Sequence, residues 1–286
     1  MNRELNFEGP SPLLYLVATP IGNLSEMTPR AISVLNEMDF VAAEDTRNSG
    51  KLLAYFHIDK PFISCHEHNE EEASAKIVAL LQQGKKIAYM SDAGYPTLSD
   101  PGSRLVANCL SSGIKVSVLS GPSAAINALS ISGLDSSHFY FHGFLSAKES
   151  EKTAELKSLA KKQETMIFYE SPHRIEKTLH SMASAFGDER RAAICRELTK
   201  AHEEVIRGTF GELNELNPAT LRGEMVIVVE GALDEPKEQN EEDYLKALNQ
   251  YLEQGMRGKE AVAKVASDFS APKNLIYSLY IEHFKS

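Results

Sequence analysis

The chain has 286 residues, of which 42% are hydrophobic, so it is long enough to bury one large core or two cores of ordinary size. Its formal net charge of −10 argues against broad, non-specific binding to nucleic acid. No apolar run approaches the roughly 20 residues of a membrane-spanning helix, and the first residues lack an apolar signal-peptide core. We therefore expect a cytoplasmic protein that does not associate with a membrane.

The first half of the chain alternates short apolar runs with amphipathic helical stretches. Thr28 and Pro29 are typical of an N-cap and a first helical residue, and Asn69 and Gly84 are typical of the two ends of another helix. We predict strands over 13–18, 39–45, 86–92 and 115–120, and helices over 28–38, 70–84, a stretch ending at 113, and the Ala-rich part of 120–133. This alternation predicts an α/β fold, a mostly parallel sheet with helices on both faces.

A second set of elements follows a short connector at 134–138. We predict strands over 139–144, 165–171, 192–198, 203–209 and 223–231, with helices from 149 to 162 and ending near 187. The last 40 or so residues have helical patterns only. The sequence therefore predicts four parts, namely an α/β domain over 1–135, a second α/β domain over 136–231, an acidic linker over 232–243 and a helical appendage over 244–286.

The stretch SDAGYPTLSDPG, residues 91–102, follows a predicted strand, where open α/β sheets bind ligands. Gly94 and Gly102 permit backbone conformations closed to other residues, and two prolines stiffen the loop, although a purely structural turn is the alternative. The loop contains Asp92 and Asp100 but no Lys or Arg, and the chain has neither GxxxxGK[ST] nor GxGxxG. We therefore expect a ligand with hydroxyl groups or a positive charge rather than a nucleoside triphosphate or dinucleotide.

Polar residues also follow the first two predicted strands. Asn23, Glu44, Asp45 and Arg47 should share one rim, because parallel strands end at the same edge of a sheet. Two carboxylates and an arginine can orient a polar substrate or transfer a proton. The alternative is structural, since Glu44 or Asp45 can pair with Arg47 or cap the next helix.

No metal site is expected. His66 and His68 lack an evident third ligand, and the three cysteines are far apart and have no CxxC spacing. In the second half, Arg174 and Lys200 follow predicted strands and are candidates for contacts with an anionic substrate.

Taken in order, these loops resemble a known family. The motifs are VATPIGNL, AEDTR, HEHNE, SDAGYPTLSDPG, SGPSAAINALSISGL, FHGFLSAK, FYESPHR, RELTK and GEMVIVVEG. They are similar to the signatures of the small-subunit ribosomal RNA methyltransferase I family, within the tetrapyrrole-methylase superfamily, over roughly residues 13–231.

The resemblance implies two α/β domains of class III methyltransferase type, with S-adenosyl-L-methionine in the cleft between them, and a homodimer. It implies 2′-O-methylation of a cytidine in the decoding region of 16S rRNA, with the assembled small ribosomal subunit as partner rather than DNA. Carried over position by position, the cofactor would be contacted by Ser91, Asp92, Ala93, Gly94, Tyr95, Ser120, Gly121, Ser123, Ala124, Phe141, Leu198 and Met225.

On the substrate side, the resemblance leads to three expectations. Asn23, Glu44, Asp45 and Arg47 would shape the acceptor pocket, with Asp45 or Glu44 taking the proton from the 2′-hydroxyl. Arg174 and Lys200 would meet RNA phosphates. Because the chain is acidic, we expect a local basic rim and a folded ribonucleoprotein substrate.

Three alternatives stay open at this point. One is methylation of a tetrapyrrole-like small molecule, although TPIGNLSEMT stands where such relatives carry a GxGxGxxxLLT-like loop. Another is a ribosome-assembly factor without catalysis. Without the resemblance, the residues predict only a cleft enzyme with a ligand that lacks phosphates.

Overall fold

The computed structural model describes residues 5, 13–233, 240–269 and 271–285. The chain divides into two compact units, Met1–Ala232 and Leu233–Ser286. The first unit contains two five-stranded sheets, and the described part of the second is helical. Residues 234–239 of the predicted acidic linker lie outside the described residues, and the predicted boundaries at 135/136 and 231/232 stay predictions.

The first sheet is parallel throughout, as the alternation of strands and helices predicts. Its strand order is β3-β2-β4-β1-β5. The strands are β1 (Leu13–Val17), β2 (Phe40–Ala43), β3 (Phe62–Ser64), β4 (Ile87–Met90) and β5 (Lys115–Leu119). The helices between them are η1 (Leu24–Glu26), α1 (Pro29–Glu37), α2 (Thr46–Tyr55), α3 (Glu70–Gln82) and α4 (Ser103–Ser111).

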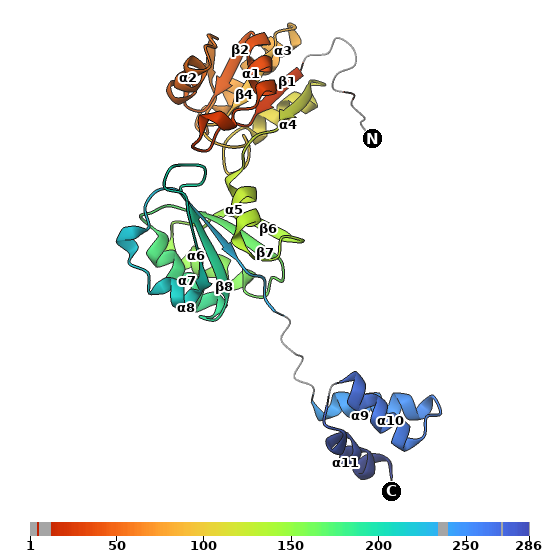
Figure 1. Ribbon diagram of the computed structural model, residues 1–286. Helices are drawn as coiled ribbons and strands as arrows, with labels where there is room; N and C mark the ends of the chain where they lie inside the picture. Colours follow the sequence, from red (N-terminus) through yellow and green to blue (C-terminus); the bar gives the residue numbers. More distant parts are fainter. Residues whose placement is uncertain (1–4, 6–12, 234–239, 270, 286) are drawn as a thin grey trace. The chain divides into compact units, whose positions relative to one another are not determined.

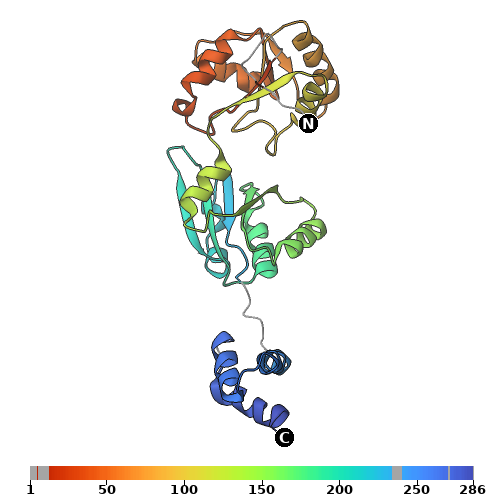
Figure 2. The same ribbon diagram turned by 90° about the vertical axis from the view of Figure 1, so that its right-hand side faces the viewer.

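Both faces of this sheet are covered by helices (Figure 2). Successive side chains of a strand point to opposite faces, and β4 is buried on both sides. Ile87 and Tyr89 pack with α3 and α4 in one core cluster. Ala88 and Met90 pack with α1 and α2 in another. The loop that follows β4 therefore emerges from a strand that is buried on both faces.

The predicted helix ends are largely confirmed. The Thr28 hydroxyl accepts a hydrogen bond from the Ala31 N–H at 3.2 Å, and Pro29 is the first helical residue of α1. Gly84 follows α3 with φ +83°. Asn69 holds the N-cap position of α3 but does not cap it, because its Oδ1 accepts from the His66 N–H at 2.8 Å instead.

The second sheet has the order β6-β7-β10-β8-β9, and it is mixed rather than parallel. Strands β6 and β7 are parallel, whereas the other three pairings are antiparallel. The strands are β6 (Phe139–Phe144), β7 (Thr165–Glu170), β8 (Arg191–Arg196), β9 (Glu204–Thr209) and β10 (Met225–Val229). The accompanying helices are α5 (Ala124–Ser132), α6 (Glu149–Leu159), α7 (Ile175–Phe186), α8 (Phe210–Asn214) and η2 (Pro218–Thr220).

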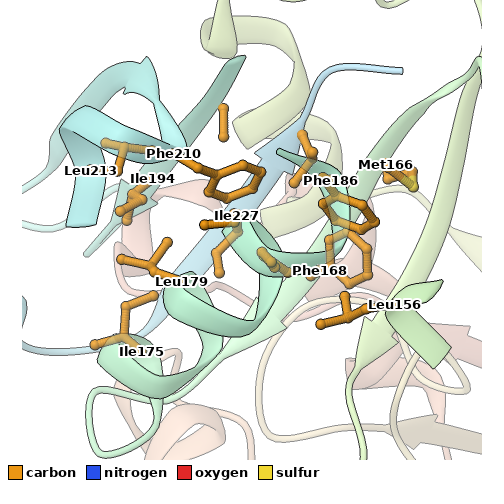
Figure 3. Packing of buried hydrophobic residues seen from close by; sticks show 14 of the residues in the cluster. Leu156, Met166, Phe168, Ile175, Leu179, Phe186, Ile194, Phe210, Leu213 and Ile227 are labelled. Carbon is orange, nitrogen blue, oxygen red and sulfur yellow. The ribbon is translucent and has the colours of Figure 1, made fainter. Parts of the chain in front are cut away.

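Different helices cover the two faces of the second sheet. On one face, Phe168 and Ile227 pack with Phe186 and Phe210 of α7 and α8 (Figure 3). On the other face α5 packs against β7, β8 and β10. Helix α5 belongs to the predicted first domain, which ends at residue 135, yet its side chains pack in the core of the second sheet. It therefore connects the two sheets.

The second unit contains three helices, α9 (Glu241–Glu253), α10 (Gly258–Asp268) and α11 (Lys273–Phe284), within its described residues (Figure 1). They share a small core that includes Leu248, Val265 and Ile276. Helix α9 begins three residues before the predicted start of the appendage at 244. No helix among the described residues of the chain has the length and apolar character to cross a membrane.

Candidate functional site

A cavity of about 320 Å³ lies in the first unit, between loops of the first sheet and strand ends of the second. This volume is within the range of small-molecule sites. Of the residues predicted to bind the cofactor, those that line it are Ala93, Gly94, Tyr95, Ser123, Ala124, Leu198 and Met225. The remaining lining residues are Ile21, Leu98, Ser99, Asp100, Phe144, Tyr169, Glu170, Ser171, Pro172, Glu224 and Val226.

The loop after β4 is held in shape by backbone hydrogen bonds. The Thr19 N–H donates to the Gly94 carbonyl at 2.9 Å, and the Gly94 N–H donates to the Thr19 carbonyl at 3.0 Å. The Tyr95 hydroxyl accepts from the Gly121 N–H at 3.2 Å. These bonds tie the exits of β1, β4 and β5 together, as expected for a pre-shaped loop.

The far end of this loop is fixed by Gly102 and Glu70. Gly102 has φ +121°, and a Cβ added there would lie 2.4 Å from the Tyr89 ring, so only glycine fits. One carboxylate oxygen of Glu70 accepts from the backbone N–H groups of Gly102 and Arg104, both at 3.0 Å. This carboxylate satisfies the free N–H groups at the start of α4, where negative charge is favoured.

Carboxylates gather beside the loop. Burial raises the pKa of Asp100 to about 6, and the negative charges of Glu44 and Asp92 act in the same direction. Burial also raises the pKa of Glu44, and the charge of Asp92 adds to that effect. Asp92 itself is exposed and accepts a hydrogen bond from the Asn48 side chain at 2.9 Å. A cation bound here would relieve the repulsion among these groups.

Asp45 caps a helix and pairs with Arg47, which is the structural alternative that the sequence left open. Asp45 caps α2 by accepting from the Arg47 N–H at 2.8 Å, and its Oδ2 lies 2.9 Å from the Arg47 guanidinium. These hydrogen bonds lower the pKa of Asp45 to about 2, so its carboxylate is a weaker base than that of Glu44. Asn23 caps η1, where its Oδ1 accepts a hydrogen bond from the Ser25 N–H at 3.1 Å.

The two predicted phosphate contacts already have partners within the chain. The Arg174 guanidinium donates to the carbonyls of Leu145 and Ser146 at 2.9 and 3.0 Å. Lys200 Nζ lies 3.1 Å from Glu197 and 2.9 Å from Glu224. Both cations thus hold the rim of the cavity together.

The other predicted cofactor residues surround the cavity without lining it. Ser91 is buried and donates to the Gly94 carbonyl at 3.3 Å, whereas Ser120 is exposed. Gly121 lies so close to Ala18 that a Cβ added to Gly121 would be 2.7 Å from the Ala18 Cβ. Phe141 packs edge-on against Tyr169, a lining residue, with 5.2 Å between ring centroids.

The sequence did not identify several of the residues that line the cavity. Tyr169 and Glu170 end β7 within the motif FYESPHR, and Glu224 precedes β10. Glu170 is buried, and the Thr178 hydroxyl donates to it at 2.6 Å. Their position at strand ends was the one feature of the sequence that could have identified them. The sequence does not show that the second sheet lies beside the loop after β4, because that depends on the packing of α5 on the second sheet.

The chemistry of the cavity follows from its charges. Asp100, Glu170 and Glu224 are among its lining residues, and no Lys or Arg is. Glu170 and Glu224 are paired with Arg174 and Lys200, so among the described residues Asp100 is the lining carboxylate without a cationic partner. Such a site disfavours phosphate groups and favours a ligand with hydroxyl groups and a positive charge. No group of three His, Cys, Asp or Glu side chains within the described ranges is arranged to hold a metal ion.

Comparison with known proteins agrees with this fold and site. A model of the tetrapyrrole (corrin/porphyrin) methylases matches residues 13–214. A solved uroporphyrin-III-C-methyltransferase from Thermus thermophilus superposes with a TM-score of 0.54 at 21% identity, over 77% of this chain and 94% of that one. The methyltransferase CobJ gives a TM-score of 0.59 at 16% identity, over 78% and 95%. The fold is therefore that of a class III methyltransferase.

Relatives with higher sequence identity indicate which family of methyltransferases the chain belongs to. A Bacillus subtilis protein named ribosomal RNA small subunit methyltransferase I is 45% identical, covering 98% of both chains. A Pasteurella multocida protein of the same name is 42% identical, over 95% of this chain and 98% of its own. The chain belongs to the ribosomal RNA small subunit methyltransferase I family of tetrapyrrole methylases.

Proposed function

We propose that the protein transfers a methyl group from S-adenosyl-L-methionine to the 2′-hydroxyl of a cytidine in the decoding region of 16S rRNA. The substrate is the assembled small ribosomal subunit. The names of relatives at 42–45% identity support the substrate class. A homodimer and a cytoplasmic location belong to the same proposal.

The observation that carries the choice of cofactor is the lining of the cavity, which includes Asp100 and contains no Lys or Arg. S-Adenosyl-L-methionine carries a sulfonium cation and a ribose diol, and it has no phosphate. The raised pKa of Asp100, about 6, reflects burial and repulsion from Glu44 and Asp92. A sulfonium near these carboxylates would offset that repulsion, so the residues present fit the group.

The predicted cofactor residues come from both sheets. Backbone groups of Ala93, Gly94 and Tyr95 would hold the cofactor from the first sheet, and Leu198 and Met225 would pack against it from the second. When bound, S-adenosyl-L-methionine supplies an electrophilic methyl group to the attacking oxygen. The protein's main contribution is to orient that oxygen and exclude water.

On the acceptor side, the pKa values favour Glu44 over Asp45 as the base. Its raised pKa brings it closer to neutral pH, whereas the low pKa of Asp45 leaves that carboxylate a poor proton acceptor. Asp45 instead fixes the start of α2 and orients Arg47. Arg47 is 86% exposed, so it remains accessible to an anionic substrate.

The deciding experiment incubates the purified protein and S-adenosyl-L-methionine with small subunits from cells that lack the gene. Nucleosides are then analysed by mass spectrometry, and naked 16S rRNA serves as a parallel substrate. A new 2′-O-methylcytidine on subunits supports the proposal, and its absence from naked RNA supports recognition of the folded particle. No transfer to either substrate would refute the proposal.

A calorimetric titration tests the cofactor separately. Affinity for S-adenosyl-L-methionine should rise as pH increases through about 6, because ionised Asp100 favours a cation. S-Adenosylhomocysteine, whose sulfur is neutral, should show a weaker pH dependence. Equal pH dependence for both ligands would argue against a sulfonium beside Asp100.

A further inference from the structure

A second cavity, of about 340 Å³, lies on the first sheet's side of the site and is here called the α2 groove. One wall is a face of α2, because residues three and four apart on a helix are neighbours. The other wall is the loop after β1. The residues that line the groove are Pro20, Gly22, Leu24, Asn48, Lys51, Leu52, Tyr55 and Asp92.

The outer end of the α2 groove carries an exposed aromatic ring. Tyr55, the last residue of α2, is 60% exposed, and its ring rests edge-on against Phe56 with 5.0 Å between centroids. Leu24, at 38% exposure, adds apolar surface nearby. A planar ring that is held on one side and open on the other is a platform for stacking a nucleobase.

Lys51 lies one helical turn before Tyr55. It is exposed and makes no hydrogen bond or ion pair with the described part of the chain. Arg174 and Lys200, by contrast, are engaged by carbonyls and carboxylates. Lys51 is therefore a cation free to meet a phosphate beside the site.

The inner end of the α2 groove leads to the cofactor cavity. Asn48 Nδ2 donates to Asp92 at 2.9 Å, and the next residue, Ala93, lines the cofactor cavity. At 1.5 Å per residue, Asn48 and Tyr55 are about 10 Å apart along α2. That is longer than the ~3.4 Å per nucleotide of a stacked strand. A base on Tyr55 would thus belong to a nucleotide about three positions along a stacked strand from the one whose ribose lies near Asp92.

We propose that the α2 groove binds the single-stranded RNA that flanks the methyl acceptor. A flanking base stacks on Tyr55, a phosphate pairs with Lys51, and the acceptor ribose lies at the Asn48–Asp92 end. This inference rests on the proposed function, because it takes the substrate to be RNA.

Kinetics on small subunits test the groove. Tyr55→Ala should lower kcat/KM about tenfold, chiefly through KM, and Tyr55→Phe should stay within about twofold because the ring is kept. Lys51→Ala should also raise KM and reduce the slope of log(kcat/KM) against log[salt] by about one. Lys76→Ala, at an exposed lysine of α3, is the matched control and should behave as wild type. The affinity for S-adenosyl-L-methionine should not change in any variant.

A cross-linking experiment gives a readout that does not need turnover. Tyr55 is replaced by the photoreactive p-benzoylphenylalanine, and Lys76 is replaced in the same way as the control. After irradiation with small subunits, position 55 should cross-link to 16S rRNA and position 76 should not.

The outcomes separate the two proposals. If wild-type protein methylates subunits but Tyr55→Ala has normal kcat/KM, or position 55 cross-links only to ribosomal proteins, the groove proposal is overturned and the proposed function stands. If wild-type protein transfers no methyl group, the proposed function fails, and the cross-link still decides whether RNA lies in the groove.

Discussion

Replacing Asp100 with Asn should stabilise the protein at pH 8. The pKa of Asp100 rises from 3.8 to about 6 on folding, which corresponds to about 3 kcal/mol at 1.36 kcal/mol per pH unit. Because the side chain is only partly buried, solvent screening reduces this to about 1 kcal/mol. The raised pKa means that the folded state binds the proton more tightly, so stability falls as pH rises between 3.8 and about 6. Asp100→Asn removes this charge.

Scanning calorimetry at pH 8 and pH 5 measures the effect on the larger unit. The midpoint of Asp100→Asn should exceed that of wild type by about 2–4 °C at pH 8. The gain should shrink by about half at pH 5, where the wild-type carboxyl is largely protonated. Asp59→Asn, at an exposed position, is the control and should give no pH-dependent gain. A variant no more stable than wild type at pH 8, or a gain independent of pH, would refute the assignment.

Substitutions at three further positions test how the loop after β4 and helix α5 are held. Gly102→Ala should cost about 3 kcal/mol, because the new Cβ meets the Tyr89 ring at a φ of +121°, and the loss is measured as a lower calorimetric midpoint. Glu70→Ala should cost about 2 kcal/mol and speed amide exchange in the first turn of α4, whereas Glu70→Gln should do less because it keeps an acceptor oxygen. Arg207→Ala should cost about 1–2 kcal/mol in urea unfolding, since the Arg207 Nε donates at 2.9 Å to the Ser132 carbonyl in the last turn of α5.

The elements that the sequence predicts well are those with local signals. The Thr28–Pro29 pair marks the start of α1 because both the cap and the fixed φ act within a few residues. A helix after Asp45 was expected, but the sequence predicted no bounds for α2, because Asn48 and Gly50 lower its helix propensity and its stability comes from packing of Leu53 on the sheet. Strand β3 was missed because it has only three residues.

Strand direction in the second sheet is a different case. Apolar runs predict that strands exist, but they do not tell which strand lies beside which. Strands β8 and β9 pair antiparallel along their full length, and β10 inserts between β7 and β8 although it comes last in the chain. These pairings depend on long-range packing, which a local pattern does not contain.

The site was predicted in part for the same reason. The loop of 91–102 was identified because its glycines, prolines and carboxylates are contiguous. The raised pKa of Asp100 was not predictable, because burial, its largest cause, depends on the folded loop, and Glu44 comes near it only through the adjacency of β2 and β4. Likewise, the sequence left the capping role of Asp45 as one of two alternatives, and the start of α2 at Thr46 decides between them.

The distribution of charge suggests how an acidic protein can orient an RNA strand. The carboxylates Glu44, Asp92 and Asp100 favour a cation, such as the proposed methyl donor, and the same charges repel a phosphate from the inner end of the α2 groove. Lys51, which has no partner among the described residues, attracts a phosphate at the outer end. In the proposed complex, a strand is thus placed with a ribose, rather than a phosphate, nearest the carboxylates. A few local charges can achieve this without a basic surface, which is compatible with a net charge of −10.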